Sequence, residues 1–312
     1  MLDGTDKIFK IINKNYKEYT KYHYPLSYQI LYFWKNYLAK DLETNKILSY
    51  LLIKALKVYN RNNKRKSYKD FIKIKNINIG KVKKADLSRE LLIPRETIRR
   101  KLEDLKKENF IGLVDGNIEV KQISFEIIDL DTIIKKYSKC LNIILDNLSD
   151  DKIIKNKNIN EDYLLNNFSQ IWINVLSMMI SLSLIWIKFL KSMENWFIFG
   201  TCGLNQMYNL KDSKNFRDLH SDNTENFFLN LTTEEMIRGL NPTTISDLTG
   251  IPRQTVIRNL KILTKSKALE KDNKRNLFYV PKNTSQQKSI VETLKKVQLV
   301  ISENVLRTLQ TI

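Results

Sequence analysis

Cysteine and histidine are scarce in this chain of 312 residues, with two of each. Cys140 and Cys202 stand far apart in the sequence, which excludes a disulfide framework and fits a reducing compartment. His23 and His220 have no neighbours at the spacing of metal ligands. The sequence therefore predicts no metal site and a cytoplasmic location.

Glycine-rich phosphate loops and catalytic groupings are also missing. None of the eight glycines falls in the pattern of a nucleotide-binding loop. Neighbouring carboxylates such as Glu103 and Asp104 are typical of solvated helix faces. Residues 1–23 are polar and basic and lack the apolar core of a signal peptide. We expect no cofactor and no catalytic residue, so the chain is not expected to be an enzyme.

Acidic residues are outnumbered by basic ones, 34 against 53, which gives a net charge of +19. A surplus of this size favours a polyanionic partner, either nucleic acid or an anionic membrane surface. A gene rich in A and T would also raise the lysine content without any function. The charge alone therefore does not decide between these explanations.

A thirteen-residue stretch occurs twice in the chain. The copies are IPRETIRRKLEDL at 93–105 and IPRQTVIRNLKIL at 251–263, and they agree at seven positions without a gap. In the first copy Ile98, Leu102 and Leu105 recur at helical spacing, which predicts a short amphipathic helix with a basic outer face. Pro94 and Pro252 are expected in the first helical turn, where the missing N–H costs nothing.

The residues before each copy predict a helix-turn-helix. Asn241 can cap a short helix, Pro242 suits its first position, and Gly250 suits a left-handed exit. The first copy has Leu92 in place of that glycine, so the turn is less regular there. A helix, a tight turn and a second helix are expected before each hairpin.

A β-hairpin is predicted after each copy. Asp115-Gly116 between two apolar runs is a strong hairpin signal. The second hairpin has a polar tip at 273–276. Residues 71–80 alternate between apolar and polar types and predict a short strand that pairs with the first hairpin. Helix, turn, helix and hairpin together make a winged helix.

Both copies resemble the DNA-binding module of bacterial winged-helix regulators of the MarR and IclR kind. The family pattern is a glycine turn, then I-P-R/K-x-T-V-x-R-x-L-x-x-L, then a basic wing. The second copy matches it throughout, whereas the first departs at Leu92 and at the wing tip, Asp115-Gly116, which is not basic. The resemblance covers residues 85–120 and 241–281. Two core helices that happen to share a sequence remain the alternative.

The resemblance implies that each second helix lies in a DNA major groove with its first residues at the base edges. Gln254 could read adenine, and basic residues would contact guanine or phosphate. The expected DNA-binding residues are Arg95, Glu96, Thr97, Arg99, Arg100, Arg253, Gln254, Thr255, Arg258, Lys274 and Arg275. The two half-sites would lie roughly 34 Å apart. They are expected to differ, because Glu96 aligns with Gln254 and Arg99 with Ile257.

Apolar helical patterns flank both copies, at 24–60, 130–148 and 290–309. The predicted fold is mostly α with small β-hairpin wings: two winged-helix domains, each flanked by long helices, forming a pseudo-dimer by internal duplication. The first domain is expected at 1–150, with its module at about 70–120. A linker follows at 151–160, and the second domain spans 161–312, with its module at about 230–281. The apolar helices would form the core or a self-association surface, and no residues mark a small-molecule effector pocket.

Several stretches outside the copies are open to more than one interpretation. Residues 163–187 carry no charge and are long enough to span a membrane, but a polar stripe favours a buried helix. Residues 60–66 form either a solvated basic loop or a phosphate contact. Gly200 and Gly203 are expected to interrupt a helix, and residues 232–235 to cap one.

Two other functions fit the same residues. A plasmid-type replication initiator also carries two winged helices in one basic chain, and it would bind tandem repeats at an origin. A membrane-tethered DNA binder would use residues 163–187 as its anchor. We rank both below a transcriptional regulator with double-stranded DNA as its partner.

Overall fold

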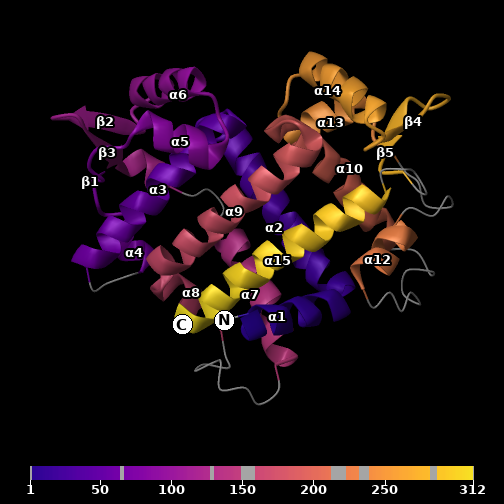
Figure 1. Ribbon diagram of the computed structural model, residues 1–312, viewed down its shortest axis with the longest axis horizontal. Coiled ribbons are helices and arrows are strands. Elements are labelled where there is room, and N and C mark those ends of the chain that lie inside the picture. Colours follow the sequence, from indigo (N-terminus) through magenta and orange to yellow (C-terminus); the bar gives the residue numbers. More distant parts are fainter. Residues whose placement is uncertain are drawn as a thin grey trace. The chain divides into compact units, whose positions relative to one another are not determined.

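The structure is a computed structural model that describes residues 2–63, 67–126, 130–148, 159–211, 223–231, 239–281 and 287–311. These residues form a mostly helical protein with small antiparallel sheets, as predicted (Figure 1). The elements up to residue 126 are α1 (Leu2–Lys14), α2 (Tyr16–Asn36), α3 (Leu42–Asn62), α4 (Tyr68–Phe71), β1 (Asn76–Asn78), α5 (Lys84–Leu91), α6 (Arg95–Lys107), β2 (Ile111–Val114), β3 (Asn117–Lys121) and η1 (Gln122–Phe125). The later elements are α7 (Leu130–Asp146), α8 (Glu161–Asn166), α9 (Phe168–Leu190), α10 (Met193–Lys211), α12 (Thr224–Leu231), α13 (Pro242–Thr249), α14 (Arg253–Lys265), β4 (Glu270–Asp272), β5 (Leu277–Tyr279) and α15 (Gln287–Thr311).

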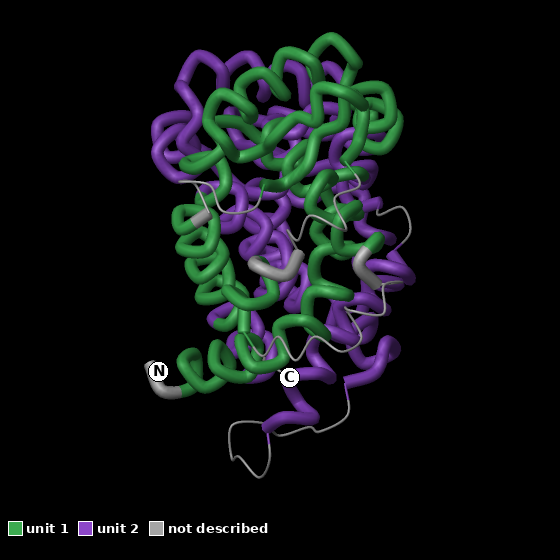
Figure 2. Tube along the Cα trace, turned by 90° about the vertical axis from the view of Figure 1, so that its right-hand side faces the viewer, with its two compact units in different colours: residues 1–32, 185–302 green, residues 33–184, 303–312 purple. Residues whose placement is uncertain are grey.

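The chain divides into two compact units (Figure 2). Unit 1 comprises residues 1–32 and 185–302, and unit 2 comprises residues 33–184 and 303–312. The predicted halves, 1–150 and 161–312, therefore each combine segments of both units. Most of the predicted linker, up to residue 158, lies outside the described residues.

In unit 2, α5 and α6 are followed by a three-stranded antiparallel sheet of order β1-β3-β2. Asp115 and Gly116 turn the chain between β2 and β3 with φ values of 51° and 77°. Two successive positive φ values are the requirement of a tight type I′ hairpin turn. This confirms the predicted hairpin and the predicted strand within 71–80. We call residues 76–121 the first module.

In unit 1, α13 and α14 are followed by the hairpin of β4 and β5, whose tip is the polar segment predicted at 273–276. Leu240 adds an isolated bridge to Phe278, with backbone hydrogen bonds of 2.9 and 2.8 Å. This bridge takes the place that β1 has beside β3 in the first module. We call residues 240–279 the second module.

Each module packs on a long helix that begins with the same kind of turn. α3 contacts α5, α6 and β1, and α10 contacts α13, α14 and β5 (Figure 1). Lys40 and Lys191 have positive φ values, 50° and 76°, just before the two helices. The side chains of Asp41 and Ser192 then accept a hydrogen bond from the amide three residues later, at 2.7 and 3.0 Å. The local similarity thus extends beyond the repeated stretch.

The helices α7 and α15 confirm the patterns predicted at 130–148 and 290–309. In unit 2, α7, α9 and α15 share a buried polar group centred on Thr308. The hydroxyl of Tyr137 lies 3.0 Å from the Thr308 hydroxyl, and the Asn174 amide donates to it at 3.1 Å. These contacts fix the three helices against one another in that unit.

The uncharged stretch 163–187 is divided between two helices, because α8 ends at Asn166 and α9 begins at Phe168. Within the described residues, α9 is the one helix that is long and apolar enough to cross a membrane, and 61% of its most apolar window is buried. Gln170 in the predicted polar stripe accepts a hydrogen bond from Asn60. This contact and those of Asn174 favour a buried core helix.

Two local expectations are wrong. α10 continues through Gly200 and Gly203, where a break was expected. The basic loop expected at 60–66 starts later, because α3 continues to Asn62. Residues 2–14 form α1, and α2 begins at Tyr16, in a stretch for which no secondary structure was predicted. The cap predicted at 232–235 and the end of the basic loop, 64–66, lie outside the described residues.

Candidate nucleic-acid interface

The repeated stretch forms the same elements at a constant offset along the chain. α5 and α13 begin at Lys84 and Pro242, and α6 and α14 begin at Arg95 and Arg253. The ends of the helices keep the same offset. In each module the two helices pack directly on each other.

A left-handed residue makes the turn between the two helices in both modules. Leu92 has φ 52° and Gly250 has φ 69°, and the N–H of each donates to a serine carbonyl four residues back, that of Ser88 or Ser246. Glycine adopts this conformation freely, whereas leucine is destabilised by about 1 kcal/mol. The turn predicted for the first module therefore forms without glycine. The predicted cap of α13 is confirmed, since the Asn241 side chain accepts a hydrogen bond of 2.9 Å from the backbone amide of Thr244.

Pro94 and Pro252 stand one position earlier than expected. Both are N-cap residues with ψ near the extended region, 142° and 134°, and the helices begin at the next residue. The Pro94 carbonyl accepts the first helical hydrogen bond, from Ile98 at 2.9 Å. Arg95 and Arg253 therefore occupy the first position of each helix.

The outer faces of α6 and α14 carry the predicted residues. Ile98 and Leu105 are buried on the inner face of α6, and Val256, Leu260 and Leu263 on that of α14. The predicted residues with exposed side chains are Arg95, Glu96, Arg99, Arg100, Arg253, Gln254, Arg258, Lys274 and Arg275, while Thr97 and Thr255 are half-buried. α6 and α14 therefore each present their predicted residues on one helix face, and Lys274 and Arg275 lie on the second hairpin.

In the first module, Arg99 and Glu96 form a two-pronged ion pair in the first turns of α6. Arg99 Nε donates to both carboxylate oxygens at 3.0 Å, and Nη2 donates to one of them at 2.6 Å. The hydrogen bond from Arg99 lowers the pKa of Glu96 and raises that of Arg99. The pair offers an acceptor beside a donor, whereas an unpaired arginine would offer donors alone.

The second module has a different outer face. α14 contains no acidic residue, whereas α6 contains three. Ile257 stands where the first module has Arg99. Arg253 Nε donates to the Thr243 hydroxyl at 3.2 Å, which orients its side chain along the helix pair. This face therefore has the more uniformly positive charge.

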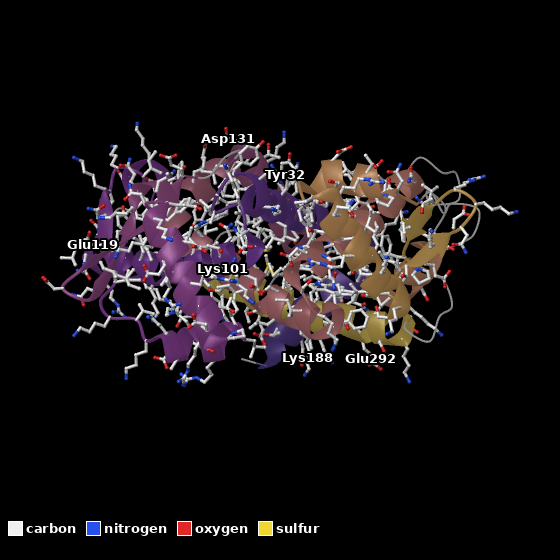
Figure 3. The ribbon with its side chains drawn as sticks, turned by 90° about the horizontal axis from the view of Figure 1, so that it is seen from above. Tyr32, Lys101, Glu119, Asp131, Lys188 and Glu292 are labelled. Atoms are coloured by element: carbon white, nitrogen blue, oxygen red, sulfur yellow. The ribbon has the colours of Figure 1, made fainter. Side chains whose placement is uncertain are left out.

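The two hairpin tips differ in the same direction. In the second, the Asp272 carboxylate accepts from the backbone amides of Lys274 and Arg275 at 2.9 and 3.3 Å, which fixes the tip that carries both cations. In the first, Leu113 and Val114 are exposed beside the tip. Figure 3 labels Glu119 on β3, where it pairs with Lys121 at 2.9 Å. The first hairpin thus has little positive charge of its own.

Three lysines that are not among the predicted residues supply charge to the first module. Lys81, Lys83 and Lys84 lie before and at the start of α5 and are exposed. A Cβ atom on Gly116 would lie 3.7 Å from Lys81 Cε, so Lys81 reaches the hairpin tip. After the hydrogen bond from Arg99, the charge of Lys84 also lowers the pKa of Glu96. The run KVKK was the available signal.

Metal and thiol chemistry gain no support from the described residues. They contain no group of three or more metal-ligating side chains. Cys140 and Cys202 are buried and form no disulfide, and burial raises the pKa of Cys202 to about 12. His220 lies outside the described residues, and His23 is buried.

Comparison of the chain with protein-family models, with curated proteins and with solved structures gave no match. The candidate interface therefore rests on the repeated geometry and on its exposed side chains.

Proposed function

We propose that this protein is a sequence-specific double-stranded DNA-binding protein, a transcriptional regulator with two winged helix-turn-helix modules. One observation carries the proposal: both modules combine a helix, a left-handed turn, a second helix with an exposed arginine at its first position, and an antiparallel hairpin. A helix with a basic outer face suits the major groove of DNA. The net charge of +19 supports a polyanionic partner.

We further propose that the two modules arose by internal duplication and act as a pseudo-dimer. The constant offset of the helix bounds supports this, as do the matching turns before α3 and α10. A single chain would then provide the two DNA contacts that a winged-helix dimer provides with two chains. Its site would have two parts.

The first turns of α6 and α14 would read base edges. Arg95 and Arg253 occupy the same helical position and would each contact guanine or phosphate. Gln254 would pair with adenine through its amide, and the carboxylate of Glu96 would accept from the exocyclic amine of cytosine. The two half-sites would therefore differ in sequence. Thr97, Arg100, Thr255 and Arg258 would contact bases or phosphates from the same faces.

The hairpin tips and the loop before α5 would contact the DNA backbone. Lys274 and Arg275 project from the ordered tip of the second hairpin. In the first module, the DNA backbone would be contacted by Lys81, Lys83 and Lys84. Phosphate contacts fix the position of a protein on DNA and release counterions, so binding would weaken steeply with salt.

Selection of bound sequences from random DNA tests the proposal, with the purified protein at two salt concentrations. The wild-type protein is expected to select a two-part motif with unequal halves. The double variant Arg95→Ala/Arg253→Ala should lose the motif, because each substitution removes an arginine from a first helical turn. Each lost base contact is expected to cost about 1–3 kcal/mol.

The control removes the same charge elsewhere. Lys135 and Lys139 are exposed on α7, and Lys135→Ala/Lys139→Ala should keep the motif. Salt-sensitive binding without a motif, equal in both double variants, would mean that net charge alone holds the DNA. A motif made of tandem repeats near a replication origin would instead identify a plasmid-type replication initiator.

A further inference from the structure

A buried lysine on α3 contacts the first module. Lys46 is on α3, and 1% of its surface is exposed. Lysine is almost never fully buried unless it has a partner. Its ammonium group donates a hydrogen bond of 2.9 Å to the backbone carbonyl of Leu91.

The acceptor is the last residue of α5, at the start of the turn that leads to α6. Carbonyl groups at the end of a helix have no partner within the helix and carry partial negative charge. The ammonium group of Lys46 satisfies one of them from the side. The next residue, Leu92, is the left-handed residue of the turn, with φ 52°.

The stability of the core alone does not explain a lysine at position 46. Burial lowers its pKa to about 8, and the charge of Glu43 opposes this shift only in part. A buried charge disfavours folding relative to an apolar side chain of similar shape. Its retention is explained if the bond to Leu91 holds a geometry that the turn requires.

The second module has no such requirement, because glycine stands at the matching position. Gly250 adopts φ 69° without a side-chain clash, whereas Leu92 keeps its exposed side chain, 66% accessible, in a conformation that leucine disfavours. The lysine bond is therefore found in the module whose turn is strained.

α3 also holds the second helix of the first module. Lys101 on α6 (Figure 3) pairs with Asp41, the N-cap of α3, at 2.7 Å. Burial raises the pKa of Asp41, but the hydrogen bonds from Lys101 and Thr44 lower it overall. The start of α3 thus contacts the end of α5 through Lys46 and the middle of α6 through Asp41.

We propose that Lys46 is a positioning residue, which holds the strained turn at Leu92 and thereby sets the position of the DNA-contacting first turn of α6. The proposal rests on the DNA-binding function proposed above. It predicts that Lys46 affects the first half-site and leaves the second unchanged.

The test replaces Lys46 by methionine, which keeps the shape of the side chain and removes the donor. Lys46→Met should speed hydrogen exchange at the amides of Leu92 and Ile93 and weaken binding to the isolated first half-site about tenfold. Binding to the isolated second half-site should stay as in the wild type. Adding Leu92→Gly should restore both properties, because glycine relieves the strain that the lysine bond opposes.

A pH series gives a readout that a general packing role would not move. Between pH 7 and 9.5 the exchange rates of Lys46→Met and wild type, compared at equal pH, should converge as Lys46 loses its charge. A neutral amine makes a weaker hydrogen bond than an ammonium group. If Lys46→Met yields too little folded protein, the double variant with Leu92→Gly and this series on the wild type carry the test.

Unchanged exchange at the turn in Lys46→Met would overturn the proposal, and so would equal losses at both half-sites. A wild-type protein that binds no DNA would sink the proposed function instead. In that case the exchange measurements still decide whether Lys46 holds the turn.

Discussion

His23 on α2 is a buried, uncharged histidine in a cluster of aromatic residues. Its ring stacks on Tyr19 at 5.5 Å between centroids, and the Ser27 hydroxyl lies 3.5 Å from Nε2. Burial lowers the pKa of His23 to about 4. The folded protein therefore keeps the ring neutral at pH values where the unfolded chain, with a pKa of about 6.5, binds a proton.

This difference predicts acid sensitivity. The stability that the neutral ring contributes is present above about pH 6.5 and is lost as the pH falls towards 4, because the unfolded state then holds more protons. Between pH 7.5 and 5 the free energy of unfolding should fall by about 2 kcal/mol from this residue. Urea unfolding at a series of pH values measures the slope.

The variant His23→Asn serves as the control for that slope. It should be less stable at neutral pH, because it leaves space in the core. The pH dependence in this window should nevertheless become shallower than in the wild type. Equal slopes in the two proteins would show that His23 is protonated in the folded state as easily as in the unfolded chain.

At the scale of single elements, two glycines of unit 1 have opposite roles. Gly239 precedes the Leu240 bridge to the second hairpin, and a Cβ atom there would lie 2.8 Å from the Phe278 carbonyl oxygen. Gly200 lies within α10, and a Cβ atom there would meet nothing within 4 Å. One position excludes a side chain, and the other has room for it.

Alanine at the two positions should therefore shift stability in opposite directions. Gly239→Ala should destabilise the protein by about 1–3 kcal/mol, because backbone atoms of β5 must move. Gly200→Ala should stabilise it by about 0.5–1 kcal/mol, because alanine favours the helix over glycine. Thermal unfolding of both variants measures the shifts. A stabilised Gly239→Ala would mean that the Leu240 bridge does not pack as closely as described.

The elements also show which features the sequence could predict. The cap at Asn241, the glycine turn at Gly250 and the hairpin at Asp115-Gly116 were predicted because each depends on residues within a few positions. Gly200 was misjudged, because a single glycine is tolerated inside a helix that packs along its length. The bond from Lys46 to Leu91 could not be predicted, since its partners meet only after α3 packs on the first module.

The candidate site divides along the same line. The outer-face residues of α6 and α14 follow from helical spacing, and their exposure agrees with it. The contribution of Lys81 could not be predicted from helical spacing, because its place beside Gly116 depends on β1 pairing with β3. The repeated sequence identifies the outer faces of α6 and α14. The pairing of strands that are distant in the sequence decides which other charged side chains lie beside them.

At the scale of the whole molecule, the excess of basic residues has two explanations. The net charge of +19 suits DNA, but lysine is also frequent in proteins from AT-rich genes. Uniform attraction to DNA would depend on the net charge alone, whereas specific binding depends on where the charges lie. An arginine stands at the first position of both α6 and α14. This matched placement supports specific binding over uniform attraction.

Two modules in one chain also predict a gain from linkage. Once one module is bound, the other meets its half-site at a high effective concentration, so the two-part site should bind about 10²–10⁴ times more tightly than either half alone. Arg253→Ala should reduce the affinity for the complete site to about that of the isolated first half-site, because the linked contact is lost. Titration of fluorescently labelled DNA with the complete site and with each half measures these ratios.

Lys139→Ala, which removes one exposed charge from α7, should keep most of the gain. If the complete site binds no more tightly than its better half, the two modules act on separate DNA molecules, and the pseudo-dimer is excluded even though each module binds DNA.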